Sequence, residues 1–422
     1  MAQTSIAATL TRSAEVDEQV AALGPRDIAV ALLTYNNAET VKNVIATAAL
    51  GLERHFPGAT AAVINADAGS SDGTRELLAE AGLPAIRIQH MAPPDERVTV
   101  PFHGVPGRSA ALRATFDVAH RLGARVLVVL EADLTSMTDE WMARLAGPVL
   151  EKQADFVSPV YARHRYEGTI PSLLMSPLVR ALYGRRVRRP LGGQQALSAR
   201  LLEHLLIHPK WQWSGRDISD LWVLGTAVAD GFSVWEAWLG RRTIRSATRT
   251  VDLPTMVVQT LGSAFTLMDR HEELWLEVRG SEPLPEIGQP SPVSVEPTDV
   301  DVERMRDGFR RGLRDLTPVW EHVLAPETLG DVLSLETAPG PFAFPDNLWA
   351  RIVYDFALGH HYGVIHGDHL LRSLVPLYLG RTAAFVIVTQ RRSAEASEGL
   401  LEGVAAAFER QKAYLVERWR TI

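Results

Sequence analysis

The chain has 422 residues, of which 46% are hydrophobic and 22% charged, so it can bury one large core or two medium ones. Its net charge of −7 excludes the basic surplus that holds nucleic acid by counterion release, so we expect no nucleic-acid partner. Cysteine is absent, which excludes disulfides, thiolate zinc sites and thiol nucleophiles.

Residues 1–25 are predicted to form an N-terminal extension. They contain Glu15, Asp17 and Glu18 and lack an apolar core, so they do not resemble a signal peptide. No uninterrupted apolar run in the sequence approaches the roughly 18 residues that a membrane-spanning helix requires. We therefore expect a soluble, cytoplasmic protein without a transmembrane segment.

Strand and helix patterns alternate over the next hundred residues. The apolar run "DIAVALL" (27–33) predicts a buried strand, and residues 34–50 follow with helical spacing. The same alternation continues through "ATAAVINADAG" (59–69), a helix over 70–82, "PAIRIQHM" (84–91), a helix over 107–123 and "ARVLVVLEAD" (124–133). This pattern predicts an α/β fold with a mostly parallel sheet covered on both faces.

The second half of the chain has a different character. Five prolines fall between 282 and 299, which excludes a helix there and disfavours a sheet. Beyond them the apolar spacing is mainly helical. We predict a domain over 26–281, a proline-rich linker over 282–300 and a mainly helical C-terminal region over 301–422.

Three polar loops follow predicted strands, at 34–37, 67–72 and 131–133. In open parallel sheets, ligands bind beyond the carboxyl ends of the strands, so these loops should share one rim. The loop that begins at Asp67 has an alternative interpretation as an ordinary capped turn, because Ser70 to Asp72 can cap the helix that follows.

The segments "ALLTYNNAETV" (31–41), "DAGSSDGT" (67–74) and "EAD" (131–133) resemble, in order and spacing, the nucleotide-sugar-binding half of glycosyltransferases with the GT-A fold. The resemblance implies a Rossmann-like GT-A domain in which the first loops hold the nucleoside. The donor-binding residues that it implies are Leu33, Thr34, Asn36, Asp67 and Ala132.

Four further segments narrow the resemblance: "PGRSAALRA" (106–114), "EADLTSM" (131–137), "RRPLGGQQALSARLL" (188–202) and "GFSVWEAW" (231–238). They are similar to segments of retaining mannosylglycerate synthases and glucosyl-3-phosphoglycerate synthases, and residues 341–358 resemble the helical C-terminal part of the former. Together the segments span roughly residues 28–380. The implied reaction is transfer of a hexose, with retention, from GDP-mannose, GDP-glucose or UDP-glucose to a small anionic acceptor such as glycerate.

Two alternatives stay open at this point. One is transfer to a larger glycoside or a lipid. The other is a non-catalytic or regulatory nucleotide-sugar-binding protein of the same fold. A homo-oligomer is also left open.

The resemblance also implies roles on the acceptor side. Gly192, Gly193 and Gln194 occupy the loop where the transferred sugar meets the acceptor, and two glycines let backbone N–H groups approach an anion closely. Arg163 and Thr169 precede a predicted helix and would bind the acceptor's carboxylate or phosphate. Asp220 would be the catalytic-site acid that positions the acceptor hydroxyl, whereas Asp217 is better explained as a helix cap.

The charge of the donor diphosphate has two candidate partners. A divalent cation, Mg²⁺ or Mn²⁺, would be held by the catalytic-site Asp133 and by Glu131, although the families' motif begins with Asp rather than Glu. The families' metal-binding His falls on Arg245 here, and a guanidinium holds diphosphate oxygens directly. We favour a weakened metal requirement, with Arg245 and its neighbours Arg242 and Arg249 replacing the cation.

Two other basic groups complete the predictions. Arg108 stands where the families carry a lysine and would keep a positive charge near the donor diphosphate. The run "LGHHYGVIHGD" (358–368) lacks the i, i+4 histidine pair of a zinc-binding helix, so its histidines are expected to pack or cap.

Overall fold

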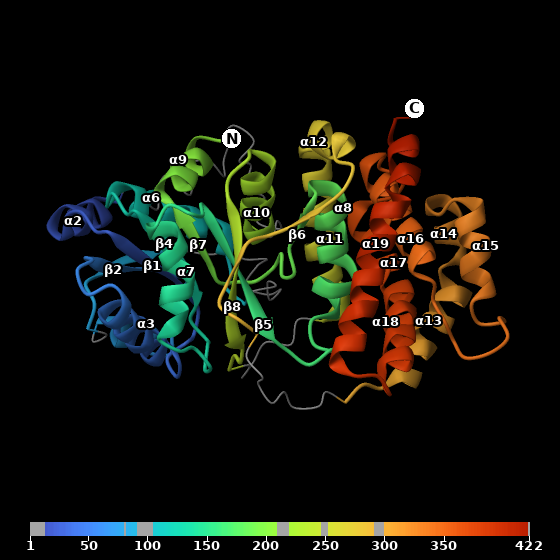
Figure 1. Ribbon diagram of the computed structural model, residues 1–422, viewed down its shortest axis with the longest axis horizontal. Coiled ribbons are helices and arrows are strands. Elements are labelled where there is room, and N and C mark those ends of the chain that lie inside the picture. Colours follow the sequence, from blue (N-terminus) through green and yellow to red (C-terminus); the bar gives the residue numbers. More distant parts are fainter. Residues whose placement is uncertain are drawn as a thin grey trace. The chain divides into compact units, whose positions relative to one another are not determined.

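The computed structural model describes residues 13–79, 82–90, 104–208, 219–245, 252–290 and 299–420. The chain forms two compact units, and neither is continuous in sequence (Figure 1). Unit 1 comprises Met1–Arg163, Leu191–Val251 and Leu284–Ser294, and unit 2 comprises His164–Pro190, Asp252–Pro283 and Val295–Ile422. This division differs from the predicted boundaries at 281 and 300, because helical periodicity identifies helices but does not show which other elements they pack against.

Unit 1 contains an eight-stranded sheet with the order β10-β8-β5-β7-β4-β1-β2-β3. All the pairings are parallel except those of β7, which runs antiparallel to both β4 and β5. The predicted α/β fold with a mostly parallel sheet is therefore confirmed. The strands are β1 (Ile28–Thr34), β2 (Ala61–Asp67), β3 (Ala85–Gln89), β4 (Val126–Glu131), β5 (Phe156–Ala162), β7 (Gln195–Ser198), β8 (Val234–Arg241) and β10 (Glu286–Ile287).

The central strands are buried on both faces, since every residue of β1 and β4 is buried. One face of the sheet packs its alternate residues, such as Val30 and Val128, against apolar side chains of α3 and α7. Helices α6, α9 and α10 lie together and complete the unit with α2 and α4. The bounds are α2 (Ala14–Leu23), α3 (Val41–His55), α4 (Thr74–Ala79), α6 (Arg108–Arg121), α7 (Glu140–Leu150), α9 (Ala199–Ile207) and α10 (Ser219–Ala229).

Part of the predicted linker belongs to the sheet. Residues Glu286 and Ile287 form β10, which pairs in parallel with β8, and the carbonyl oxygen of Pro285 accepts a hydrogen bond of 2.9 Å from the amide of Glu236. The expectation that the prolines keep this stretch out of a sheet was therefore wrong for these residues. Proline lacks an amide hydrogen but keeps its carbonyl acceptor, so this short edge strand tolerates Pro285.

Unit 2 is mainly helical, as predicted for the C-terminal region. It also includes a two-stranded sheet of β6 (Arg185–Arg186) and β9 (Glu282–Pro283), which pair in parallel. Its helices are the π-helix η1 (Pro171–Met175), α8 (Ser176–Tyr183), α11 (Leu253–Arg270), α12 (Glu272–Glu277), α13 (Val302–Asp315), α14 (Thr317–Val323), α15 (Pro326–Ser334), α16 (Asp346–His361), α17 (Gly367–Ser373), α18 (Val375–Thr389) and α19 (Ala394–Trp419).

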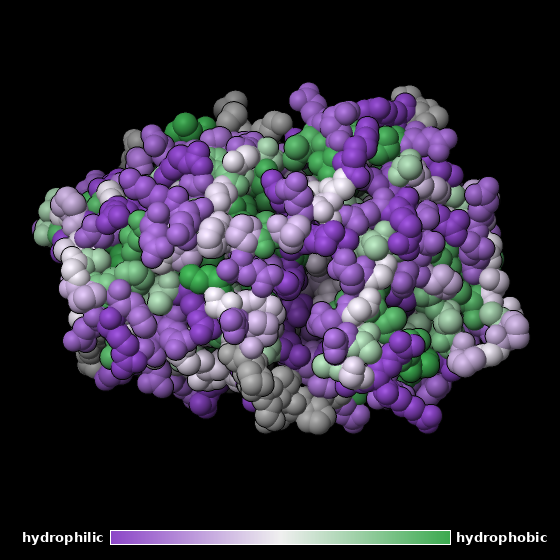
Figure 2. Space-filling model, viewed as in Figure 1, coloured by the Kyte–Doolittle hydropathy of each residue, from purple (hydrophilic) through white to green (hydrophobic). Residues whose placement is uncertain are grey.

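One helical stretch of unit 2, Gly367–Thr389, is long and apolar enough to cross a membrane by length and composition. In the folded chain, however, 72% of its apolar window is buried, and α18 packs against α13. A helix that is buried in a protein core has the same apolar composition. The face of the molecule in Figure 2 is largely hydrophilic, with hydrophobic residues scattered among hydrophilic ones.

Candidate active site

Three strands of unit 1 end side by side and bring polar residues to one edge of the sheet. In the sheet register, Thr34 at the end of β1 is paired with Asp67 at the end of β2, and Leu33 is paired with Glu131 at the end of β4. Leu33 is itself buried within β1. The predicted common rim of the three polar loops is therefore present.

Asp67 organises the first part of this rim. Its Oδ2 accepts hydrogen bonds from the hydroxyls of Thr34 (2.8 Å) and Ser70 (2.6 Å), and its Oδ1 accepts from the amides of Gly69 (3.0 Å) and Ser70 (2.8 Å). The side chain is buried. A carboxylate that accepts four internal hydrogen bonds fixes the loop in which it lies.

The loop after β1 is joined to the loop after β2 by further hydrogen bonds. Asn36 has the left-handed backbone angle φ of 56°, and its amide donates to the Ser70 hydroxyl at 2.9 Å. The amide of Ala38 donates to Asp72 at 2.9 Å. Burial raises the pKa of the Asp72 carboxyl, but hydrogen bonds from Thr74 and Ala38 outweigh burial and lower the pKa below its usual value. The two loops thus form one rigid wall.

Glu131 lies at the centre of a second group of residues. Its side chain is 6% exposed, and its Oε2 accepts from Nε (2.9 Å) and Nη2 (2.5 Å) of Arg242 and from Nε2 of Gln194 (2.5 Å). The amide oxygen of Gln194 in turn accepts from the hydroxyl of Tyr161. Burial alone would lower the pKa of Arg242, but Glu131, Tyr161 and Asp133 together outweigh burial and raise that pKa.

The loop before β7 approaches Glu131 without an intervening side chain. Gly193 has a φ of +80°, and a Cβ atom placed there would lie 2.5 Å from Oε1 of Glu131. Only glycine satisfies both conditions at no steric cost. The loop predicted to meet the transferred sugar, Gly192 to Gln194, is therefore packed directly on this carboxylate.

Arg108 and Asp220 form a buried bidentate ion pair beside the same loop. The guanidinium donates from Nε to Oδ2 (3.0 Å) and from Nη2 to Oδ1 (2.8 Å), and Nη2 lies 3.5 Å from the carbonyl oxygen of Gly193. Burial would lower the pKa of Arg108, but Asp220, Glu131 and Asp133 together raise it. This pair joins the first turn of α6 to the first turn of α10.

A strand-like segment after β8 places Arg242 and Arg245 along the "EAD" loop. Leu134 bridges to Ile244, and the amide of Arg245 donates to the carbonyl oxygen of Asp133 at 2.9 Å. The Arg245 side chain is 54% exposed and pairs with Glu39, which is 61% exposed. The guanidinium that contacts Glu131 is therefore that of Arg242, three residues before the position inferred from sequence.

The charges of this cluster decide whether a cation fits. Glu131, Asp133 and Asp220 carry three negative charges, and Arg108 and Arg242 carry two positive ones. Glu131 already accepts three hydrogen bonds on Oε2, and its Oε1 faces Gly193. Both guanidiniums lie close enough to the carboxylates to respond to them electrostatically, so they offset two of the three negative charges that would attract a cation. The arrangement does not fit a divalent ion shared by Glu131 and Asp133.

The other predicted residues lie as follows. Ala132 is buried, and its carbonyl oxygen accepts from the Thr40 hydroxyl at 2.7 Å. Arg163, in unit 1, lies over the ring of Tyr161 at 5.2 Å, whereas Thr169 belongs to unit 2 and bonds to the Tyr378 hydroxyl. Asp217 and Arg249 lie outside the described residues.

The sequence did not predict the places of two residues in the cluster, Tyr161 and Arg242. Tyr161 carries no motif, and only its place at the end of β5 brings it to Gln194. Arg242 was considered only as a neighbour of Arg245. A signal was available, because β8 ends at Arg241 and the residue immediately after a strand lies closest to the rim.

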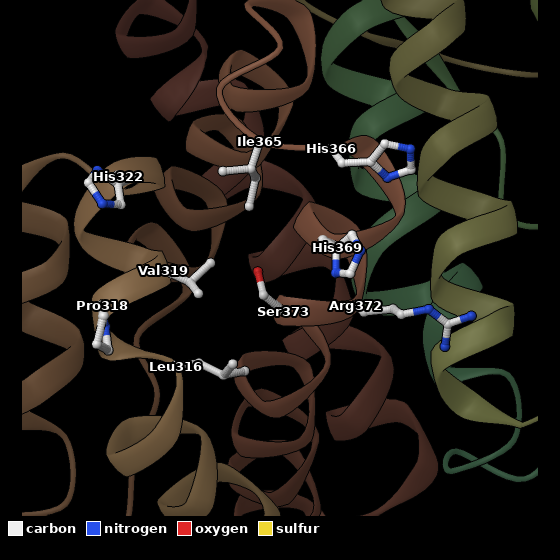
Figure 3. A pocket seen from close by; sticks show the side chains of 9 residues that line it. All are labelled: Leu316, Pro318, Val319, His322, Ile365, His366, His369, Arg372 and Ser373. Atoms are coloured by element: carbon white, nitrogen blue, oxygen red, sulfur yellow. The ribbon is translucent and has the colours of Figure 1, made fainter.

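The histidines of 358–368 lie in unit 2. His360 packs on Phe265 with ring centroids 5.6 Å apart, and His361 stacks on Trp419 at 3.9 Å, so both pack as expected. His366 lines a cavity of about 560 Å³ (Figure 3). The cavity wall comes from α14, α17 and the residues that precede them: Leu316, Pro318, Val319, His322, Ile365, His366, His369, Arg372 and Ser373.

Among known proteins, the chain has matches in solved structures. No protein-family model and no curated protein sequence matches the chain. Among solved structures, it is similar to glucosyl-3-phosphoglycerate synthase from Mycobacterium tuberculosis. The structure in complex with phosphoglyceric acid and that with Mn²⁺, UDP and glucosyl-3-phosphoglycerate each show 22% identity and a TM-score of 0.44, over 61% of this chain and 84% of that one. The structure with Mn²⁺ and UDP-glucose shows 22% identity and a TM-score of 0.43 over 61% and 83% of the two chains, and similarity at this level does not assign an activity.

Proposed function

We propose that unit 1 transfers a hexose from a nucleotide sugar, such as GDP-mannose, GDP-glucose or UDP-glucose, to a small anionic acceptor such as glycerate, with retention of configuration. The observation that supports this most is the cluster of three carboxylates and two guanidiniums at the carboxyl ends of the parallel strands. It is bordered on one side by the wall around Asp67 and on the other by the Gly192–Gln194 loop.

The nucleoside would bind at the wall formed by the loops after β1 and β2. Thr34, Asn36 and Asp67 are held there by one another and by Ser70. Because the Asp67 carboxylate is internally satisfied, it supports the nucleoside site by fixing loop shape. Leu33 and Ala132 contribute the backbone at the ends of β1 and β4.

The donor diphosphate would be held by arginine. Arg242 uses Nε and Nη2 on Glu131, and the part of the chain that the structure describes offers no acceptor to its Nη1. A phosphate oxygen would accept a hydrogen bond from Nη1. Arg108, whose Nη2 lies 3.5 Å from the carbonyl oxygen of Gly193, would add a second positive charge. Arg245 would act further out, after release from its exposed pair with Glu39. The requirement of the reaction for Mg²⁺ or Mn²⁺ would then be weakened.

The acceptor would lie between Asp220 and the Gly192–Gln194 loop, with Arg163 contributing to recognition of its carboxylate. The bidentate contact with Arg108 fixes the Asp220 side chain, so that its oxygens can accept a hydrogen bond from the acceptor hydroxyl. Asp133, which is half-buried, would face the sugar. Catalysis would then depend on positioning and on charge stabilisation of the departing diphosphate.

A non-catalytic nucleotide-sugar-binding protein is the second candidate, and one observation favours it. Glu131 and Asp220, two of the three acids, are each occupied by an arginine. In such a protein, the cluster would stabilise the loops and bind donor without turning it over.

One experiment separates these possibilities. The full chain is incubated with each nucleotide sugar and with glycerate or 3-phosphoglycerate, in excess EDTA and with added Mn²⁺, and released nucleoside diphosphate and glycoside are measured. We expect acceptor-dependent release in EDTA. Binding of donor without release would support the second candidate, and activity that requires Mn²⁺ would contradict the arginine assignment.

The Arg242 assignment has its own test by calorimetry. A charge-assisted contact of this kind contributes about 1.5 to 3 kcal/mol, so Arg242→Met should weaken donor binding about tenfold to a hundredfold in EDTA. The matched control is Arg245→Met, which should weaken binding less. Equal losses of donor affinity in the two variants would contradict the assignment of the diphosphate to Arg242 and would favour Arg245, the residue inferred from the sequence.

A further inference from the structure

A cluster of two histidines and one carboxylate lies in unit 1, outside the residues of the candidate active site. His204 is in the last turn of α9 and His208 caps that helix, and Asp230 directly follows α10. His204 Nε2 is 2.6 Å from Oδ2 of Asp230, and His208 Nε2 is 3.4 Å from the same oxygen. One ligand atom from each residue lies within 4.8 Å of the other two.

The backbone explains why these three side chains meet. Residues i and i+4 of a helix lie on one face, so His204 and His208 project together. Helix α10 ends in hydrogen bonds from the amides of Asp230 and Phe232 to the carbonyl oxygens of Thr226 and Ala227, each 2.9 Å, with Gly231 at a φ of +76°. This turn directs Asp230 toward the end of α9.

The electrostatics of the place favour a cation. The C-terminal ends of α9 and α10 both carry the negative end of a helix dipole, and Asp230 adds a full negative charge. The guanidinium of Arg200, which lies over the ring of Phe232, is bound by both oxygens of Asp155. Two neutral imidazoles and a carboxylate are a donor set that divalent transition metals prefer.

The geometry is close to that of a metal site. Ligands about 2.0 to 2.1 Å from a tetrahedral zinc ion lie roughly 3.3 Å from one another. The separation of His208 from Asp230 already has this value, and that of His204 from Asp230 must open by about 0.7 Å. Both of those side chains are about one-third exposed, so a small rotation is sterically open to them, while Trp222 and Phe232 shield the inner side of the histidine rings.

We propose that His204, His208 and Asp230 bind one zinc-like divalent transition-metal ion, with water at the remaining position, and that this ion ties the end of α9 to the end of α10. The sequence signal was the H-x-x-x-H spacing at 204–208. The site is separate from the carboxylates proposed to face the donor. Metal binding there can therefore be tested independently of the proposed transferase activity.

The test uses the full, tag-free chain, whose lack of cysteine removes thiolate as a competing ligand. Co²⁺ is titrated while visible absorption is recorded, and Zn²⁺ is then added to displace it. We expect one Co²⁺ per chain with the intense spectrum of a low-coordinate ion, and displacement by one equivalent of Zn²⁺. Zn²⁺ should also raise the melting temperature.

Variants locate the site. His204→Gln with His208→Gln keeps hydrogen-bonding side chains but removes both imidazole ligands, and it should weaken Co²⁺ binding at least a hundredfold. The matched control is His366→Gln with His369→Gln, a histidine pair of unit 2 whose rings are 5.6 Å apart, which should bind like the parent. Absence of a Co²⁺ spectrum in the parent, or an unchanged spectrum in the first variant, would overturn the proposal. The three side chains would then only join the ends of α9 and α10 by hydrogen bonds.

Discussion

Replacing Arg242 with methionine should destabilise unit 1 specifically. The substitution leaves Glu131 buried without its ionic partner, and removal of one member of a buried pair costs about 3 to 5 kcal/mol. Gln194 still donates to the carboxylate, and Arg108 still attracts it, so we expect the lower end, about 3 kcal/mol. The loss should be visible as faster hydrogen exchange in peptides that cover β4 and β7.

The loss should also depend on pH. In Arg242→Met the unpaired, buried Glu131 should acquire a pKa above that of an unfolded glutamate, about 4.3. A group whose folded pKa is raised favours the folded state below the unfolded pKa and loses that contribution as pH rises through the folded pKa. The difference between variant and parent should therefore be largest near pH 8 and shrink toward pH 4.

Two controls make this prediction refutable. Arg245→Met breaks a pair between two exposed side chains and should cost less than about 1 kcal/mol. The double variant Arg242→Met with Glu131→Gln removes both charges and should recover most of the stability lost by the single variant. Equal losses for Arg242→Met and Arg245→Met, or no recovery in the double variant, would refute the argument that Glu131 is held by Arg242.

Three further predictions concern single side chains. Gly193→Ala introduces a methyl group 2.5 Å from the Glu131 carboxylate at a φ of +80°, so it should lower stability by at least the roughly 1 to 2 kcal/mol of left-handed strain and abolish turnover, both measured on the purified variant. Asp220→Asn weakens the contact with Arg108 and should reduce kcat far more than donor affinity; unchanged kcat would make Asp220 structural. Burial lowers the pKa of Lys412 to about 8, so between pH 8 and 10.5 the unfolded chain binds the extra proton and the free energy of unfolding should rise with pH, an increase that Lys412→Met should lack in urea titrations.

Much of unit 1 could be predicted because its signals are local. Buried runs such as 28–34 and 126–131 predict strands from apolar content alone, and the polar residues that end them fall on one rim in any parallel sheet. Register then places Thr34 beside Asp67 without further assumptions. The α/β class and the position of the rim therefore followed from the sequence.

The parts that could not be predicted depend on contacts between distant residues. The partner of Glu131 depends on how the segment after β8 lies along the "EAD" loop, and a three-residue difference in that placement exchanges Arg242 for Arg245. The unit boundaries depend on which helices pack together, so residues 164–190 and 252–281, which the sequence placed with the first domain, belong to unit 2. The roles assigned to site residues stay predictions.

The antiparallel strand β7 has a consequence for folding kinetics. Since an antiparallel strand begins where its parallel neighbours end, inserting β7 between β4 and β5 brings Gly192–Gln194 to the rim. That insertion pairs residues 195–198 with residues near 126–129 and 156–157, which are far apart in sequence, and such pairings close slowly because large loops must be ordered first. Donor binding should therefore appear late in refolding, after much of the helical circular-dichroism signal has returned. The time at which donor binding appears would report when the sheet is complete.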